Sequence, residues 1–474
     1  MPEHRILNTI CRIKLLLLAL FVSFPGCTEI VLETLPSTPI LSFDELKQTV
    51  SRIRKLPFQH EVLLESRRIQ DIKANLEKSA LEEYGIEKFQ QVAQVYARLG
   101  LLSETSDFPN TLAKFRLLQQ GTHYNSQRKR IVVPKEPWSP GLSFLGPAQG
   151  QEDAKNDTGK QLLLTLALNN ALQDQHFRWK EQLKRINTKD ARLAFRALVN
   201  GDANLVGLAH LMGDGEEHPL KVLDKIKGLA ILASRMEKGF LNFPELLRQK
   251  TLFNVIHGSQ FVIWAYSFKG WEGVNRLYSD PPISTEQILH PEKYYEKREG
   301  ITTIATWSLA RQFENDGMKV FDETLGEFLI RVLLRRNLPE DEADQAAAGW
   351  AGDHLLAFQK GQKLVLGWIT AWDSREDAVQ FYRSYRQALE SQYDLSLKPA
   401  PGGGDSLTTP LQSATPLLLQ LKKNLVFFLD GIPWPRSREI AEEVWKEMET
   451  GPEPQTIPFD LVQRLVSHSP PAKK

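Results

Sequence analysis

Histidine is the side chain best suited to metal ligation and to proton transfer near neutral pH. His176, His210, His257, His290 and His354 are scattered singly along this sequence. Ser259 lacks the Gly-x-Ser-x-Gly turn of serine hydrolases, and no Gly-x4-Gly-Lys phosphate loop occurs. A lone histidine is more often a packed or surface residue than a ligand, so none of these positions by itself predicts a catalytic centre.

One apolar segment with helical periodicity also contains a run of polar residues. From Leu164 to Phe177 it reads Leu-Thr-Leu-Ala-Leu-Asn-Asn-Ala-Leu-Gln-Asp-Gln-His-Phe. This stretch resembles the zinc-binding helix of a bacterial family of lipoproteins similar to gluzincin-type zinc metallopeptidases, where a His-Glu-x-x-His unit is followed by Ala-Leu-Gln-Asp-Gln. Residues Ala197 to Ala203 resemble the family's second helix, whose glutamate before Gly-Asp-Ala is the third zinc ligand.

Two further stretches agree with the family in the same order along the chain. The first is Gly270 to Asn275, which leads into Pro281 to Tyr294, and the second is Ala348 to Asp353. The resemblance therefore extends over most of the span from about residue 110 to about residue 385.

The resemblance implies a zinc site whose ligands are missing from this chain. The family's chemistry needs two imidazoles one helical turn apart, a glutamate between them as general base, and a carboxylate from a neighbouring helix. Those four positions carry Leu166, Ala167, Asn170 and Asn200 here. Leucine and alanine supply no donor atom, and a neutral amide is a poor zinc ligand. We therefore expect no metal or other cofactor and no peptidase activity by this mechanism.

Residues around the degenerate site still match the family, which predicts that the scaffold is kept. They are Gln173, Asp174, Gln175, Gly201 and Asp202, and Glu286, His290 and Asp353 match without an assigned role. Because Asn170 and Asn200 replace two ligands of one ion, we expect their amides to lie within direct or one-water contact in a buried site. Leu166 should share their helix face.

The N-terminus has the pattern of an export signal. Basic residues precede the apolar run Leu15 to Phe24, which is too short to span a bilayer as a helix. The following Phe24-Pro25-Gly26-Cys27 resembles a bacterial lipobox, where the cysteine is acylated, although Phe24 and Pro25 depart from the usual pattern. An ordinary secretory signal or an uncleaved anchor is the alternative. Cys11, the other cysteine, precedes the expected cleavage point, so the mature chain should have no internal disulfide.

Composition limits the function classes. The 474-residue chain is 42% hydrophobic and 25% charged, ordinary values for globular proteins. A formal net charge of +1 argues against a nucleic-acid partner, because phosphate binding requires an excess of Lys and Arg.

The sequence predicts an α+β, mainly helical fold: a metallopeptidase-like scaffold with a buried former zinc-binding helix and a small sheet. Ser42 and Glu45 form a capping-box pattern at a helix start. Helical spacing runs from Glu61 to Leu102, with Gly100 as C-cap. We further expect short strands at residues 121–124 and 130–133, core helices at Leu162 to Trp179 and Ala191 to Met212, and a buried strand at Leu425 to Leu429.

Glycine- and proline-rich stretches suggest the domain boundaries. The expected parts are a signal peptide (1–26), a tether (27–41), an N-terminal helical region with short strands (42–134), a loop or linker (135–160), a pseudopeptidase core (161–397), a glycine-rich linker (398–411), a small C-terminal α/β unit (412–466) and a disordered tail (467–474).

These features predict an exported, lipid-anchored, non-catalytic pseudopeptidase of the bacterial cell envelope. It would contact the membrane through the lipid on Cys27, and bind a peptide, a protein or an envelope polymer through the former substrate cleft. One alternative is a hydrolase with an active site rebuilt elsewhere, for example from His176, His290 and Asp353 with a metal. Another is a structural component of an envelope assembly.

Overall fold

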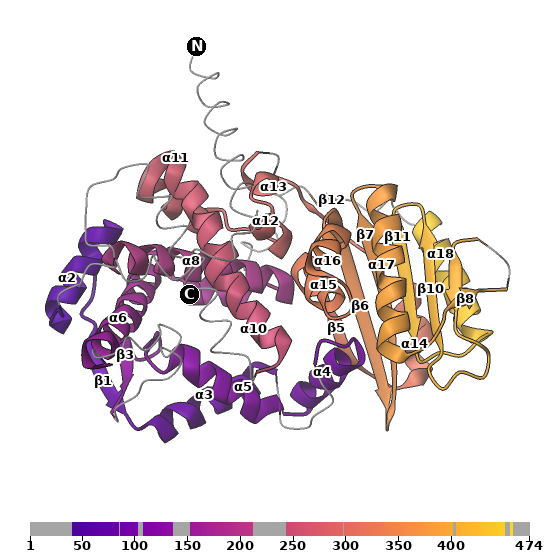
Figure 1. The fold of residues 1–474 in the computed structure, drawn as a ribbon, viewed down its shortest axis with the longest axis horizontal. Coiled ribbons are helices and arrows are strands. Elements are labelled where there is room, and N and C mark those ends of the chain that lie inside the picture. Colours follow the sequence, from indigo (N-terminus) through magenta and orange to yellow (C-terminus); the bar gives the residue numbers. More distant parts are fainter. Residues whose placement is uncertain are drawn as a thin grey trace, which may run out of the picture.

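The computed structural model describes residues 40–457, apart from residues 85, 103–107, 136–151, 212–242, 297, 402–403 and 451–455. A helical half lies beside a half built on a large β-sheet (Figure 1). The fold is mixed α and β and mainly helical, as predicted at that level. Among the described residues, no helix is both long and apolar enough to cross a bilayer. The expected signal peptide, Cys27 and the tail from residue 467 lie outside the described residues.

The N-terminal region begins with the predicted capping box. Helix α2 (Phe43–Arg54) starts after Ser42, whose hydroxyl accepts the Glu45 amide, while the Glu45 carboxylate accepts the Ser42 amide at 2.8 Å. The next helices are α3 (Ile69–Tyr84), α4 (Ile86–Arg98) and α5 (Phe108–Gln120). Gly100 follows α4 with a left-handed φ of +82°, which confirms it as the end of that helical stretch.

A three-stranded sheet in the order β1-β3-β2 interrupts this region. Its strands are β1 (Leu63–Arg67), β2 (His123–Asn125) and β3 (Arg130–Pro134). The predicted hairpin β2–β3 is confirmed, but the prediction of helix from Glu61 onward is wrong at β1. Strand β1 pairs in parallel with β3, where Leu63 is opposite Arg130, and this non-local pairing overrides the local helical spacing.

The helical half is assembled around two helices that the sequence predicted, α6 (Glu152–Phe177) and α8 (Lys189–Leu211). It also contains α7 (Trp179–Arg185), α10 (Glu245–Leu252), the π-helical turn η2 (Phe253–His257), α11 (Gly258–Ser279), α12 (Thr285–Leu289) and α13 (Glu292–Tyr295). Helix α6 begins inside the stretch 135–160 that we expected to be a loop. Its first turns have little apolar periodicity, so the hydrophobic pattern gave no sign of them.

The second half contains a seven-stranded antiparallel sheet in the order β5-β6-β7-β11-β10-β9-β8. The strands are β5 (Met318–Glu323), β6 (Trp350–Lys360), β7 (Lys363–Trp372), β8 (Lys398–Pro399), β9 (Ser406–Thr408), β10 (Leu417–Lys422) and β11 (Leu425–Asp430). The predicted buried strand is β11. Residues 398–411, expected as a linker, supply β8 and β9. The expected C-terminal unit supplies β10 and β11 to the same sheet, so it is not separate from the core.

Helices cover both faces of this sheet (Figure 1). One face packs against α17 (Arg375–Tyr393), with α15 (Gly326–Arg335) and α16 (Glu340–Ala347) beside it, and the other against α14 (Trp307–Phe313) and α18 (Arg436–Thr450). Successive residues of β6 alternate between the two cores, Leu355 with the first and Leu356 with the second. The short strands β4 (Ile301–Thr302) and β12 (Thr456–Ile457) pair separately.

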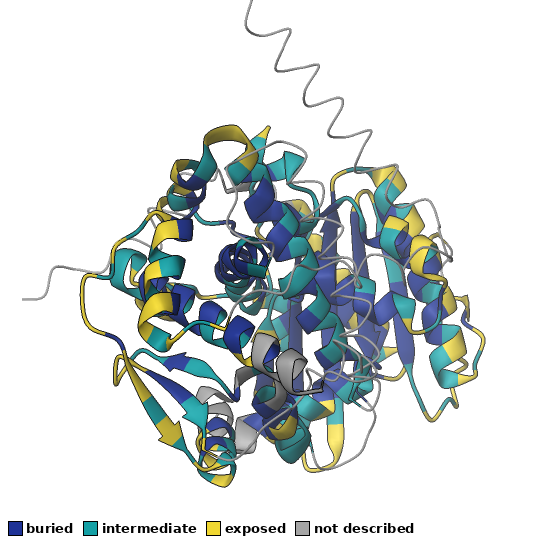
Figure 2. Ribbon diagram, turned by 60° about the vertical axis from the view of Figure 1, so that its left-hand side comes forward, coloured by how far each residue is buried: buried dark blue, intermediate teal, exposed yellow. Residues whose placement is uncertain are grey.

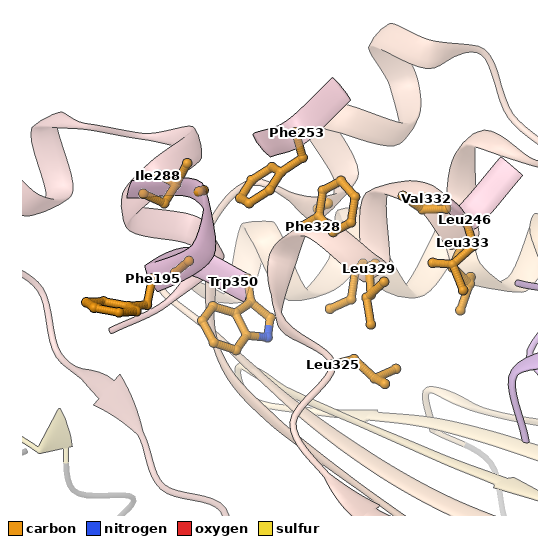
Figure 3. Packing of buried hydrophobic residues seen from close by; sticks show 14 of the residues in the cluster. Phe195, Leu246, Phe253, Ile288, Leu325, Phe328, Leu329, Val332, Leu333 and Trp350 are labelled. Atoms are coloured by element: carbon orange, nitrogen blue, oxygen red, sulfur yellow. The ribbon is translucent and has the colours of Figure 1, made fainter. Parts of the chain in front are cut away.

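A continuous hydrophobic core joins the two halves. Phe195 of α8, Phe253 of η2, Phe328 of α15 and Trp350 of β6 are buried in one cluster (Figure 3). Figure 2 shows that buried residues run through the central helices and the sheet, while exposed residues lie mainly on the outer elements. The two halves therefore share one core.

A buried ion pair joins four helices of the helical half. Arg54, the last residue of α2, and Asp202 of α8 are both fully buried, with Nε–Oδ1 and Nη2–Oδ2 distances of 2.8 and 3.1 Å. The Tyr278 hydroxyl and the Asn169 amide also donate to Asp202, at 2.8 and 3.3 Å. The Arg54 guanidinium lies 4.4 Å from the centre of the Trp271 ring. These contacts tie α2, α6 and α11 to α8.

Helix α8 crosses the start of α11 at glycines on both sides. A Cβ atom on Gly201 would lie 2.1 Å from the carbonyl oxygen of Gly258, and one on Gly258 would lie 2.3 Å from the carbonyl oxygen of Ala197. Only glycine permits this backbone approach, which explains Gly201 in the sequence motif structurally.

We predict that Arg54→Met lowers the free energy of unfolding by about 3 to 5 kcal/mol, because it leaves Asp202 charged and buried without its cation. Urea denaturation followed by circular dichroism measures the change. The control is Arg68→Met, which removes an exposed ion pair with Asp71 and should cost under about 1 kcal/mol. Equal losses in the two variants would contradict the role given to the buried pair.

Candidate functional site

Two of the four degenerate positions carry apolar side chains of α6 that pack inside the helical half. The Leu166 side chain is half-buried and lies against Gly207, where an added Cβ would be 3.0 Å from Leu166 Cδ2. Ala167 is buried. The positions that hold a zinc ligand and a general base in the resembled family therefore belong to hydrophobic helix packing in this chain.

We expected Asn170 and Asn200 to lie in direct or one-water contact in a buried site, but both residues are half-buried and no direct hydrogen bond joins them. Asn200 Nδ2 donates to the backbone carbonyl of Arg196 in its own helix, at 2.8 Å. Asn170 Oδ1 is buried and has no hydrogen-bond partner among the described residues. Their neighbours join the helices instead: Asn169 donates to Asp202, and Gln173 Nε2 donates to the Val199 carbonyl at 2.9 Å.

The polar residues after the degenerate site hold neighbouring segments in place. Gln175 accepts the Gln59 amide at 2.7 Å and donates to the His60 carbonyl at 3.1 Å. His176 Nε2 lies 2.7 Å from the Pro57 carbonyl oxygen. Burial raises the pKa of the Asp174 carboxyl, and its hydrogen bond with Tyr124 of β2 opposes that shift. The Gln173 to His176 motif thus binds α6 to the segment after α2 and to the small sheet.

Asp353 is a buried cap of helix α15. Its carboxylate accepts the backbone amides of Leu325 and Gly326, both at 2.9 Å. It also accepts the indole N–H groups of Trp350 and Trp368, at 3.0 and 2.9 Å. With four donors, this carboxylate is fully occupied in fixing α15 and two tryptophans against the sheet, and it offers no free oxygen lone pair directed to a ligand.

A second buried carboxylate, Asp190 of α8, lies beside the same helix start. It accepts both the amide and the hydroxyl of Thr285, whose oxygen in turn accepts the Phe328 amide at 3.2 Å. Gly326, with φ +79°, leaves room for it, because a Cβ there would lie 1.8 Å from Asp190 Oδ1. Burial, and secondarily the nearby charges of Asp353 and Glu327, raise the pKa of Asp190 to about 7.

The described part of the chain offers one histidine–carboxylate pair with a buried acid. His290 Nε2 lies 2.9 Å from Oε1 of Glu327, and Arg331 Nε donates to the same oxygen at 2.9 Å. Burial works against ionisation, but Arg331 and His290 hold the pKa of Glu327 below its usual value. Its other oxygen, Oε2, is buried without a partner. Such a pair is able in principle to orient an imidazole for proton transfer.

Sequence reasoning identified His290 but missed Glu327. The available signal was the i,i+4 spacing of Glu327 and Arg331 on an otherwise apolar helix. His257, on the π-helical turn η2, lies near these residues. Burial, followed by the positive charges of Arg331 and Arg335, lowers the pKa of His257 to about 3, which keeps its imidazole neutral. His176 is bonded to Pro57 instead, so His176, His290 and Asp353 do not form one site.

One carboxylate group in the described ranges has the geometry of a metal site: Glu286, Glu299 and Asp373. A lysine ammonium already lies among them. Lys293 Nζ is 2.7, 3.1 and 2.6 Å from these three carboxylates, in that order. Burial raises the pKa of Glu286 well above its usual value, and the charge of Lys293 opposes this. The Lys293 ammonium contacts all three carboxylates, so the group is a lysine-centred cluster and does not fit a divalent ion.

Comparison with known proteins gives one match. The family described as "Domain of unknown function (DUF8575)" matches residues 311–410, from α14 to just beyond β9. No curated protein and no solved structure matches the chain. The matched part contains Glu327, Arg331 and Asp353, and excludes α6 and α8.

We predict that Asp190→Asn becomes more stable relative to the parent chain as pH rises from about 4 to about 7. Folding raises the pKa of Asp190, so the parent chain has the full contribution of this carboxyl to its stability only at low pH. As pH rises through the range in which the unfolded state ionises first, the stability of the parent chain falls by at most about 1.4 kcal/mol per pH unit, and the asparagine variant has no such loss. Thermal or urea unfolding of both proteins across this range measures the difference. A difference that does not change with pH would show that Asp190 is not linked to proton binding.

Proposed function

We propose that this protein is a non-catalytic, lipid-anchored pseudopeptidase of the bacterial cell envelope. In this proposal a metallopeptidase-like scaffold is retained and binds a peptide, a protein or an envelope polymer, while its zinc chemistry is lost. The observation that carries it is that Leu166 packs against Gly207 of α8 and that Ala167 is buried in the hydrophobic core. Those are the positions of a zinc ligand and the general base in the resembled family.

The donor set supports the absence of zinc chemistry. Leu166 and Ala167 provide no ligand atom, and the remaining positions carry neutral amides, one of which is bonded to its own helix through Nδ2. In the described ranges, the single group of three candidate ligands surrounds Lys293, on other elements. An ammonium and a divalent cation compete for the same carboxylates, so this group is no substitute zinc site.

The half-buried amides support binding in place of catalysis. An asparagine side chain offers two donors and one acceptor oxygen, the same chemistry as a peptide backbone. Asn170 Oδ1 has no partner among the described residues, and Asn200 lies on the neighbouring helix. Satisfying a buried unpaired amide contributes about 1 to 3 kcal/mol, which favours a ligand with backbone-like amides.

One observation favours a second candidate function, a hydrolase with a rebuilt active site. His290 pairs with the buried Glu327, and 23% of the His290 side chain remains exposed to solvent. Casein peptides incubated with the purified chain distinguish the candidates. Hydrolysis that is lost in His290→Gln would favour the hydrolase, whereas binding without cleavage favours the pseudopeptidase.

We predict that the purified mature chain contains no stoichiometric zinc and that chelators leave its melting temperature unchanged, since a bound metal normally stabilises the native state. Elemental analysis and calorimetry test this. Stoichiometric zinc, removed by chelator with a large fall in melting temperature, would overturn the proposal.

A constructive variant extends this test of the scaffold. Leu166→His, Ala167→Glu, Asn170→His and Asn200→Glu together should restore zinc binding if α6 and α8 keep the family geometry. The matched control omits Leu166→His, and should bind zinc more weakly because it lacks one of the three protein ligands. A folded quadruple variant without zinc affinity would show that the supporting contacts differ from those of the family.

We further predict that Cys27→Ser releases the protein from membranes or leaves an unprocessed precursor. Among the described residues no helix is able to replace the lipid as a membrane anchor. Fractionation of cells and the mass of the N-terminal peptide measure the outcome. Membrane-bound protein of unchanged mass would contradict lipidation at Cys27.

A further inference from the structure

Helix α11 contains a sharp corner that projects from the helical half. Lys269 and Gly270 leave the helical conformation, and Gly270 takes a left-handed φ of +55°. Beyond the corner, Gly273 packs so tightly that an added Cβ would lie 2.3 Å from the Ala265 carbonyl oxygen. Ser267, Phe268 and Lys269 are exposed at the corner, and no atom lies within 4 Å of a Cβ built on Gly270.

Two large aromatic rings lie on the outer side of this corner. Trp264 and Phe268 are one helical turn apart, with ring centres separated by 6.1 Å. Tyr295 of α13 supports both, stacked on Trp264 at 5.6 Å and 6.2 Å from Phe268. The Tyr295 hydroxyl donates inward, to the Phe261 carbonyl at 2.9 Å. Phe268 is 49% exposed, so the corner presents an apolar ring to solvent.

The corner is in contact with the element nearest to the expected lipid anchor. Trp271, directly after Gly270, lies against Arg54 at the end of α2. Helix α2 has 12 residues, so its start is about 18 Å from Arg54. The tether expected at 27–41 spans at most about 50 Å when extended. A chain held by Cys27 is therefore able to bring the corner of α11 to the same membrane. Helix α11 lies at the top of the helical half in Figure 1.

We propose that this corner, formed by Trp264, Phe268 and Lys269, is a second membrane contact that enters the headgroup region of an anionic phospholipid bilayer. Aromatic rings favour the membrane–water interface, and a lysine beside them keeps its ammonium among the headgroups. A lipid on a flexible tether leaves the folded body free to rotate, so a second contact fixes the orientation of the body at the membrane. The inference rests on the proposed anchoring at Cys27.

The shape and polarity of the corner favour a lipid surface over a protein or sugar ligand. No atom lies within 4 Å of a Cβ built on Gly270, so the corner is open to solvent, and phenylalanine offers no hydrogen bond to a polar ligand. Ser267 already donates its hydroxyl to the Trp264 carbonyl at 2.8 Å. A sugar stacked on these rings would therefore meet few free polar groups, whereas a bilayer interface needs none from Phe268.

The test places a reporter at the corner. The chain from Thr28 onward keeps every described residue and contains no cysteine, so Phe268→Cys gives one labelling position for an environment-sensitive fluorophore. An N-terminal hexahistidine tag holds the protein on vesicles of phosphatidylethanolamine, phosphatidylglycerol and nickel-chelating lipid. We expect brominated acyl chains to quench this label at least about threefold more than a label at Trp307→Cys. Trp307 is the matched control, an aromatic residue 66% exposed on α14.

Equal quenching at the two positions would overturn the membrane contact. As a second measurement, Lys269→Glu in the labelled protein should reduce quenching on vesicles with phosphatidylglycerol, and an unchanged signal would remove the proposed role of the lysine. Because the tag replaces the natural anchor, the result does not depend on Cys27. A failure of lipidation at Cys27 and a failure of the aromatic corner are thus observed separately.

Discussion

The helical half depends on one buried ion pair, between Arg54 and Asp202. Taking two charges out of water costs several kcal/mol for each ion, so such a pair is tolerated only when further hydrogen bonds satisfy it. Asp202 obtains them from Tyr278 and Asn169, and the guanidinium lies over Trp271. The partners come from four helices, and removing any one of them leaves charge or polar atoms unsatisfied. This constraint fixes α6 against α8, and hence the geometry of the degenerate site between them.

A second buried polar contact connects the helical half to the sheet. Asp353 of β6 and Asp190 of α8 meet at the start of α15, and Gly326 provides the space between them. Together, these two polar contacts explain several of the residues that match the resembled family. Gly201, Asp202 and Asp353 are explained by backbone approach, ion pairing and helix capping. Folding therefore requires these residues, whatever ligand the chain binds.

The sequence predicted those helices and strands whose own residues carry a cap, a turn or a hydrophobic repeat. The Ser42 capping box, the β2–β3 hairpin and helices α6 and α8 follow from caps, turn formers and hydrophobic spacing. Strand β1 and strands β8 and β9 depend on partners far along the chain, and no local pattern reveals such partners. At the degenerate site, the predicted polar contact was assigned one residue too far along helix α6. Asn169 and Asn170 differ by about 100° around the helix, and only Asn169 faces Asp202.

The His290–Glu327 pair is the strongest argument for retained catalysis, and its electrostatics weaken that argument. A carboxylate raises the basicity of an imidazole through its unshared negative charge. Here the oxygen of Glu327 that contacts His290 also accepts the Arg331 guanidinium, and Arg335 pairs with the neighbouring Asp344. The charge of Glu327 is thus already compensated by a permanent cation. Nearby, burial and, after it, the charges of two arginines lower the pKa of His257 and keep its imidazole neutral. The cluster is therefore better described as a network of ion pairs at the α12–α15 contact than as a site with a catalytic base. This favours the binding function.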